Sequence, residues 1–542
     1  MDLVSSGCRK SLDQLLEQAM AERSREDDQV EVTYEMKEDY ACDQRPVRLK
    51  PDDQAPASSR DEKDDVDEES ENGVGSIQME KKVMKSTIIL SVAIVLCFSG
   101  FSVVQSFLST TAPRTGLQAL TILYIFAIFS SLFAPILIQK IGPKWIMVSS
   151  GLSPIIFIII FKYNYTFILI IGAMLVGLLL GPTYRAQKSY LFRNISRLSF
   201  LTQSIRKKMQ QRFLRVFFII SKSYCFWGHL IATIVMEYIN AMDTSRQPSS
   251  NETIQDAGTV ARRIDTCFTT QCKHAFLTLD FSETSKNPSN NNFLSPKVTE
   301  IFIYVFSATC AVGVLLVVIL LEKLEVLQEQ DPLERSLLYQ TLRQIKLLLI
   351  DQNVSLVVLM IVFTGIEQAF IFGDFTRDYI SCALGLESIG FTMICLGGCH
   401  TLGSIGVHLF SQHFQRPIIM AAGLVCQSGL LMVLWLWTPV KDDAAVFYVI
   451  AGGWGLCNAV WETLLMTFLT TAYPDDWQTP LSVYYQLQWL GMSIAYSFSN
   501  YFCSHIKILI LAVSLAVSII PYTILEFRLH HRNHVQNRTD ML

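Results

Sequence analysis

The chain has 542 residues, of which 51% are hydrophobic and 17% are charged, and its mean hydropathy is +0.33. A soluble protein of this length normally carries more charge and shorter apolar segments, so this composition excludes an ordinary soluble protein and predicts a membrane protein. The net charge of −4 excludes few functions, because acidic and basic residues are concentrated in segments that lie in different compartments. No nucleic-acid partner is expected.

Residues 1–82 form a polar tail. Within it, the run at 61–71 has eight acidic side chains in eleven positions and no apolar face to bury. Such a composition favours disorder, and a docking segment for a basic partner is the alternative.

Twelve apolar runs follow, each long enough to cross a bilayer as a helix. They predict an all-α membrane protein with two six-helix halves at 83–321 and 352–527, a cytoplasmic linker at 322–351 and a tail at 528–542. The predicted spans are 86–107, 117–138, 145–161, 166–186, 214–238 and 298–321 in the first half, and 354–374, 388–410, 417–437, 444–467, 481–502 and 507–527 in the second.

The placement of basic residues predicts the orientation in the membrane. The segment at 187–215 holds eight basic residues and no acidic one, which indicates the cytoplasmic side. With twelve spans, both termini then lie in the cytoplasm. The plasma membrane is the favoured location, and an endosomal or endoplasmic-reticulum membrane is the alternative.

The long segment at 239–297 lies outside the cell in this topology. It contains the glycosylation triplet that begins at Asn251, and two nearby cysteines, Cys267 and Cys272. A disulfide is favoured over a metal site for this pair, since no further Cys or His completes four ligands. Cys382 and Cys503 also fall near the outer side, and spacing alone leaves their pairing open.

The two halves share local patterns. Each has a short, basic, proline-containing turn between its second and third spans, QKIGPK at 139–144 and QHFQRP at 412–417. Each fourth span is rich in glycine and ends in an aromatic residue followed by a charged one, Tyr184-Arg185 in the first half and Trp461-Glu462 in the second. Two six-span halves with weak internal symmetry predict a major-facilitator-type bundle.

Several motifs point to one branch of that superfamily. They are GIEQAFIFGDFTRDYISCALG at 365–385, GFTMIC at 390–395, AGGWGLCNAVWETL at 451–464, YRAQKSYL at 184–191, FWGHLIATIV at 226–235 and CSHIK at 503–507. At these residues the chain resembles the uncoordinated-93 (Unc-93-like) family, a divergent branch of the major facilitator superfamily. The resemblance covers about residues 82–527.

The resemblance implies a multi-pass membrane protein without enzymatic activity. The founding member is regarded as a regulatory subunit of a two-pore-domain potassium channel, and a more distant relative escorts nucleic-acid-sensing receptors to endosomes. The Thr376-Arg377 pair and Cys382 match the channel-regulator side of the family. A potassium-channel regulatory subunit is therefore the favoured function, with a secondary transporter of unknown solute or a trafficking escort as alternatives.

The turn between the second and third spans departs from the pattern of transporting members of the superfamily. Transporting facilitators usually place an acidic residue before the basic one in the turn between spans two and three, whereas this chain has Gln139-Lys140. In transporters that turn couples the conformations, so its altered sequence argues against active transport.

The seventh span carries polar side chains at unusual depth. Glu367 and Gln368 fall near the middle of the predicted span, and Asp374 follows Glu367 by seven residues, so on an α-helix the two carboxylates share one face. A carboxylate in contact with lipid costs about 3 kcal/mol or more, so this face is expected to meet protein or water. Glu367 is interpreted either as a structural hydrogen-bonding group or as a functional one. The outer end of the span, which contains Arg377, is expected to contact a partner or to shape an outer vestibule.

Charged residues of other spans are candidates for the central cavity. By analogy with facilitator bundles, Arg185 and Glu462 face it, as do Lys222 and His229, seven residues apart in the fifth span. The hypothesis is an ion pair between the halves, Arg185 with Glu462. Its alternative is that Arg185 reaches the lipid headgroups.

Trp454, Asn458 and Trp461 fall on nearly one helical face and indicate either a packing stripe or an aromatic cavity wall. Gly177 and Gly181 are expected to allow close helix packing. The chain has no phosphate-binding loop or catalytic triad, and its histidines lack metal-ligand spacing. We therefore expect no enzyme activity, no cofactor and no metal.

Overall fold

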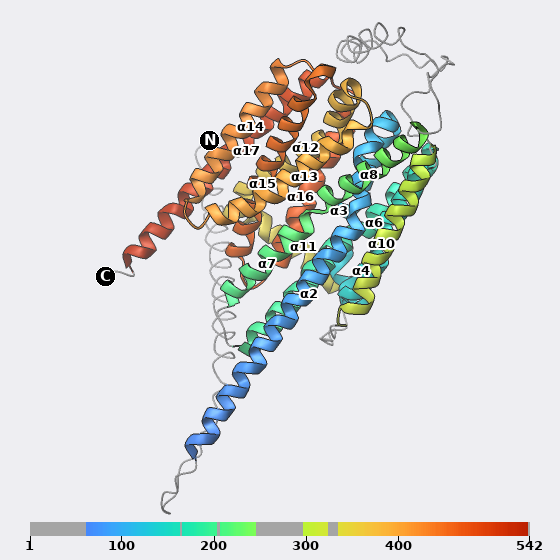
Figure 1. Ribbon diagram of the computed structural model, residues 1–542. Coiled ribbons are helices and arrows are strands. Elements are labelled where there is room, and N and C mark those ends of the chain that lie inside the picture. Colours follow the sequence, from blue (N-terminus) through green and yellow to red (C-terminus); the bar gives the residue numbers. More distant parts are fainter. Residues whose placement is uncertain (1–60, 163–164, 203–205, 245–295, 324–333, 540–542) are drawn as a thin grey trace, which may run out of the picture. The chain divides into compact units, whose positions relative to one another are not determined.

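The computed structural model describes residues 61–162, 165–202, 206–244, 296–323 and 334–539 (Figure 1). The chain divides into two units, residues 1–71 and 72–542, and the second carries the candidate residues discussed below. In the first unit the described residues, 61–71, are helical and belong to α2 (Asp61–Thr111). The acidic run, for which composition favours disorder, is therefore described as helix, in keeping with the good helix propensity of Glu.

The helices of the N-terminal half follow the predicted spans, with the third and fifth spans each divided in two. The third span consists of α4 and α5, and the fifth is interrupted at Ser223 between α7 and α8. After α2 the helices are α3 (Pro113–Ile141), α4 (Pro143–Ser150), α5 (Leu152–Lys162), α6 (Thr166–Thr202), α7 (Arg206–Lys222), α8 (Tyr224–Thr244) and α10 (Pro296–Leu320).

The C-terminal half begins after a helix that lies within the predicted linker, α11 (Glu334–Ile350). Its seventh span is α12 (Gln352–Ala369), capped at its start by the Asp351 carboxylate, and it continues directly as a π-helix, η1 (Phe370–Ser381). The remaining elements are α13 (Ser388–Phe410), α14 (Arg416–Leu436), the short 3₁₀ helix η2 (Lys441–Asp443), α15 (Ala444–Ala472), α16 (Gln478–Ser499) and α17 (Ser504–Thr539).

Eleven helices of the described chain are long and apolar enough to cross a membrane. The remaining predicted span, 481–502, coincides with α16, a helix of 22 residues that does not reach the same apolarity. Its polar side chains include Gln486 and Gln488, both of which are buried in the protein. The count of twelve spans and the pseudo-symmetric arrangement of the halves stay predictions.

Helix α16 is polar because it contacts the N-terminal half within the bundle. It packs against α3 and α6 (Figure 1). Gln486 donates to Ser131 Oγ at 2.7 Å, and the Tyr496 ring stacks on Tyr124 with centroids 6.0 Å apart. Tyr496 also accepts a hydrogen bond of 2.9 Å from Gln105. These contacts account for the low hydropathy of a helix that is buried in protein rather than in lipid.

Close helix packing depends on glycine at several crossings. A Cβ at Gly177 would meet the carbonyl of Leu123, and one at Gly181 would meet Ala127, so both residues are required where α6 crosses α3. Ser130 adds a hydrogen bond of 3.1 Å to the Gly177 carbonyl. The expectation that these two glycines allow close helix contact is confirmed.

Candidate functional site

Glu462 lies at the centre of a buried polar cluster. This α15 residue is 4% exposed, and Lys222, the last residue of α7, places its Nζ 3.0 Å from Oε1 and 2.9 Å from Oε2. The pair joins the N-terminal and C-terminal halves. A buried ion pair is tolerated when further hydrogen bonds satisfy the remaining lone pairs, and the surrounding side chains supply them.

Three more side chains point at the same carboxylate. Gln368 Nε2 donates to Oε1 at 2.8 Å, and Gln488 Nε2 does so at 3.3 Å. His400 Nε2 lies 3.3 Å from Oε2. Residues 222, 368, 400, 462 and 488, hereafter the Glu462 cluster, thus come from α7, α12, α13, α15 and α16.

A second lysine lies beside this cluster. Lys188 of α6 is 2% exposed, and its Nζ is 4.9 Å from the centroid of the Tyr485 ring and 5.0 Å from that of Phe217. The Tyr485 ring also lies 5.7 Å from Lys222 Nζ. Within the described part of the chain, no carboxylate pairs with Lys188. The aromatic faces are therefore the groups that stabilise its ammonium group within the described structure.

Glu367 is fully buried but lies outside the Glu462 cluster. The polar side chains nearest to it are Gln427 of α14 and Trp454 of α15. Neither carboxylate oxygen reaches a hydrogen-bond partner in the described structure, and the Gln427 amide and the Trp454 indole nitrogen also lack one. Three buried polar groups thus interact with one another without a hydrogen bond of standard geometry.

The predicted shared face of Glu367 and Asp374 is not formed. Glu367 lies on α12, whereas Asp374 follows the change to the wider π-helix at Phe370. A seven-residue spacing keeps two side chains on one face only at 3.6 residues per turn, so the π-helix separates them.

Asp374 belongs instead to an ion network between η1 and α17. Arg377 Nη2 lies 3.0 Å from Asp374 Oδ1, and Arg377 Nε lies 2.7 Å from Asp378 Oδ1. Lys507 of α17 bridges both carboxylates, at 2.7 Å from Asp374 and 3.2 Å from Asp378. Ser499 donates to Asp374, and Ser504 donates to Asp378 at 3.1 Å. Two cations balance two carboxylates, so this η1 network (residues 374, 377, 378 and 507) is electrically neutral.

The predicted pair of Arg185 with Glu462 is wrong. Arg185 is buried, its Nη1 has no hydrogen-bond partner in the described structure, and the carboxylate that acts on it most is Asp476. Lys222 takes the place assigned to Arg185, because it is at the end of α7 that faces α15.

His229 does not share a site with Lys222. Its Nε2 lies 3.0 Å from Ser106 Oγ of α2, and its Nδ1 lies 2.9 Å from the Cys225 carbonyl. The helix break at Ser223 ends the α-helical phase that would have put the two residues on one face. His229 therefore packs within the N-terminal half.

The aromatic residues of α15 pack against neighbouring helices. The Trp454 ring stacks on Phe370 with centroids 5.6 Å apart, and the Trp461 ring lies against Gly423 of α14. Both indole nitrogens and Asn458 Oδ1 are buried without a hydrogen-bond partner in the described structure. The packing interpretation fits these two tryptophans better than the cavity wall.

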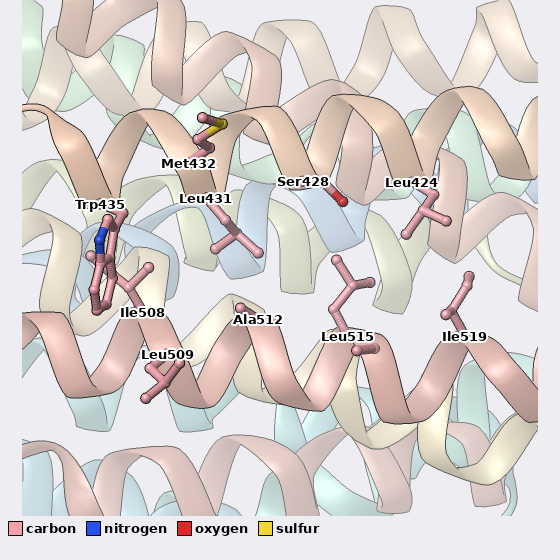
Figure 2. Close-up of a pocket in the computed structure, with 11 residues that line it drawn as sticks. Leu424, Ser428, Leu431, Met432, Trp435, Ile508, Leu509, Ala512, Leu515 and Ile519 are labelled. Atoms are coloured by element: carbon pink, nitrogen blue, oxygen red, sulfur yellow. The ribbon is translucent and has the colours of Figure 1, made fainter.

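The described residues line at least two cavities. One, of about 500 Å³, is an apolar groove between α14 and α17 (Figure 2). Its walls are mostly aliphatic, with Ser428 as a polar exception, and they include none of the residues selected from the sequence. The other, of about 270 Å³, lies between α7, α13 and α15 and reaches Lys222 and Glu462.

The cysteines near the predicted outer side do not pair with each other. Cys503 is a free thiol, whereas Cys382 is disulfide-bonded, and its partner is not among the described residues. Cys267, Cys272 and Asn251 also lie outside the described residues.

Sequence reasoning identified three members of the Glu462 cluster, Lys222, Gln368 and Glu462, but not His400 or Gln488. Both residues are polar side chains inside otherwise apolar runs. His400 ends the run GGCH before Thr401, and Gln488 lies in the run QLQW before Leu490. That signal marks a buried polar residue without indicating what it contacts.

Comparison with solved structures defines the class of protein. The fold resembles that of the nucleoside transporter NupG, with a TM-score of 0.51 and 11% identity over 82% of this chain and 99% of the transporter. The xylose transporter XylE from E. coli gives the same TM-score and identity over 81% of this chain and 96% of its own. At such low identity the likeness concerns the fold alone, which this chain shares with the two transporters.

The family model of the UNC-93 ion channel regulatory proteins matches residues 109–522, and the chain belongs to that family. The chain is 27% identical to the unc-93 homolog A of Bos taurus over 82% of this chain and 93% of that protein. It is 25% identical to the unc-93 homolog A of Homo sapiens over 82% of this chain and 93% of that protein. It is also 23% identical, over 83% of this chain and 62% of the relative, to unc-93 of Caenorhabditis elegans, whose name proposes a potassium channel regulatory protein.

Proposed function

We propose that this chain is a non-enzymatic regulatory subunit of a potassium channel of the two-pore-domain class. The observation that carries this proposal is the match of residues 109–522 to a family of ion channel regulatory proteins. We take potassium as the ion because the name of the Caenorhabditis elegans relative refers to a potassium channel.

Contacts between the halves support a regulatory rather than a transporting role. The Glu462 cluster links α7 to four helices of the C-terminal half. Elsewhere, Ser109 Oγ of α2 lies 3.1 Å from Thr376 Oγ1 of η1 and donates to the Phe372 carbonyl at 3.3 Å. Within the N-terminal half, Lys144, in the turn that couples conformations in transporters, donates to the Val318 and Leu321 carbonyls at 2.9 and 2.6 Å. A bundle with these contacts offers a partner channel one stable conformation.

The η1 network suits a structural role at the predicted outer side. Its two carboxylates are buried, with 5% of Asp374 and 4% of Asp378 exposed. Both therefore make their contacts within the protein. We infer that η1 shapes the outer surface of the bundle and that its charges do not bind a partner directly.

The proposal places both termini in the cytoplasm and residues 239–297 outside, in the plasma membrane. If so, the acceptor at Asn251 carries a glycan. We expect digestion with an N-glycosidase to increase the gel mobility of the wild-type chain, and Asn251→Gln to match the digested form. A chain that is resistant to digestion and unaffected by the substitution contradicts this orientation.

Affinity purification from a gentle detergent tests the proposed partner. We expect the tagged full-length chain to retain a potassium-channel subunit in stoichiometric amount, and co-expression to change the potassium current of that channel. A receptor client in place of a channel would support a trafficking escort, and the absence of any channel subunit contradicts the proposal.

Transport is the second candidate, because the facilitator fold holds a cavity that ends at a buried ion pair. Purified protein in vesicles distinguishes it from regulation. Solute uptake that Glu462→Gln abolishes would favour a transporter, whereas current regulation without uptake favours the subunit.

A further inference from the structure

The cavity of about 270 Å³ has an unbalanced charge. Its wall includes Arg215 and Lys222 from α7, His408 from α13, and one carboxylate, Glu462. Glu462 is already engaged by Lys222 and by three further side chains. Arg215 therefore has no counter-charge in the cavity.

Arg215 is also incompletely hydrogen-bonded. Its Nε is shielded from solvent and has no acceptor, and no described carboxylate pairs with its guanidinium group. The titratable group that interacts with it is His408, and this interaction is repulsive only when the imidazole is protonated. Arg215 is half-buried at the end of its predicted span, and an arginine that lines a cavity without a counter-charge is a candidate ligand-binding residue.

Neutral polar groups extend from the buried end of the cavity to its mouth. Ser404, near Lys222, is 8% exposed, whereas Ser411 and Gln412, just after the end of α13, are exposed. The cavity thus offers cationic donors at depth and neutral hydrogen-bonding groups at the entrance. Apart from Glu462, its described lining has no group that would repel an anion.

The surroundings of the cavity favour a negatively charged ligand. The first part of α7, residues 206–215, lies in the basic segment 187–215, which holds eight basic residues and no acidic one. A basic pocket between membrane helices on the cytoplasmic side attracts the headgroups of anionic lipids. The planar guanidinium group of arginine fits phosphate oxygens in a bidentate geometry.

We propose that this cavity binds a phosphate group, with Arg215 as its principal ligand and Lys222 and His408 as supporting donors. The phosphate comes either from the headgroup of an anionic phospholipid or from a soluble phosphate compound. The site does not depend on the channel-regulatory function, so its test uses the isolated full-length protein.

Binding to purified protein in nanodiscs tests the proposal. The probes are a fluorescent phosphatidylinositol bisphosphate, phosphatidylcholine with the same label, and inorganic phosphate as a competitor. We expect saturable binding of the anionic lipid or competition by phosphate, and no saturable binding of phosphatidylcholine. Arg215→Gln should weaken binding about tenfold or more, the effect of losing one charge-assisted contact.

The matched control is Arg197→Gln. Arg197 belongs to the same basic segment and the substitution removes the same charge, but the residue is exposed on α6 and does not line the cavity. It should change the affinity less than about twofold, the effect expected of a screened surface charge. If Arg215→Gln does not fold, Gln412→Glu at the exposed mouth provides the second test, because an added carboxylate there should also weaken binding.

The outcomes separate the two sources of phosphate. Lipid binding that inorganic phosphate does not displace supports a headgroup, and binding of inorganic phosphate without the lipid supports a soluble compound. The proposal is overturned if neither binds saturably, or if Arg197→Gln weakens binding as much as Arg215→Gln does.

Discussion

At the scale of single residues, the Glu462 carboxylate brings together side chains from four other helices. Lys222 neutralises its charge, and Gln368, Gln488 and His400 surround its oxygens at 2.8 to 3.3 Å. Removing one member of such a pair leaves a buried charge uncompensated, whereas removing both does not. The contribution of the pair to stability is therefore best measured as the coupling free energy between Lys222 and Glu462.

A double-mutant cycle of Lys222→Met and Glu462→Gln measures that coupling. Each single substitution should lower the free energy of unfolding in mixed micelles by about 3 kcal/mol, and the double variant should lose less than the sum by about 2 kcal/mol. Arg185→Gln combined with Glu462→Gln is the control and should be additive, since the two residues do not touch. Additive losses for the Lys222 cycle would contradict the pairing.

Glu367 calls for a different experiment because its carboxylate makes no hydrogen bond of standard geometry within the described residues. The substitution Glu367→Gln keeps the shape and replaces an unpaired acidic group by a neutral amide, which is less costly to bury. We expect the free energy of unfolding to stay the same or to rise, and regulation of the channel to persist. A loss of more than about 2 kcal/mol would show that the carboxylate makes a strong contact.

At the scale of elements, the η1 network fixes the end of the seventh span to α17. Two carboxylates and two cations balance there, and Lys507 is the group supplied by α17. Long π-helices are rare, and a π-helical segment is stable only when its surroundings determine it. We therefore attribute the geometry of residues 370–381 in part to this network.

Lys507→Met tests that attribution. The network would keep two carboxylates and one cation, so we expect a loss of about 3 kcal/mol in stability and faster amide hydrogen exchange within residues 370–381. Adding Asp374→Asn restores the charge balance and should recover part of both effects. Unchanged exchange in η1 after Lys507→Met would show that other contacts hold the π-helix.

The sequence predicted elements better than it predicted contacts. Apolar runs located the helices, and charges within those runs identified Lys222, Gln368 and Glu462, because a polar group in a span is visible without a structure. The partner of Glu462 was not predictable, since it depends on how far each helix is rotated and how deep each side chain lies. The helix break at Ser223 and the π-helix from Phe370 changed those rotations, and neither has a distinct signature in the sequence.

At the scale of the whole molecule, the N-terminal and C-terminal halves are joined in more than one place. The Glu462 cluster, the contact of Ser109 with Thr376, and the contacts of α16 with α3 all lie within the unit 72–542. A transporter must break some of these contacts in every cycle, whereas a regulatory subunit can act with all of them intact. This difference can be measured in living cells.

The most direct measurement is the potassium current of the partner channel, recorded with Ser109→Cys/Thr376→Cys before and after oxidation. The two hydroxyls are 3.1 Å apart, so the cysteines should form a disulfide that locks η1 to α2, and each single variant serves as a control. We predict that the pair cross-links and that the channel is regulated equally in the oxidised and reduced states. Failure to cross-link, or regulation that oxidation abolishes and reduction restores, would contradict a regulator that acts in this conformation.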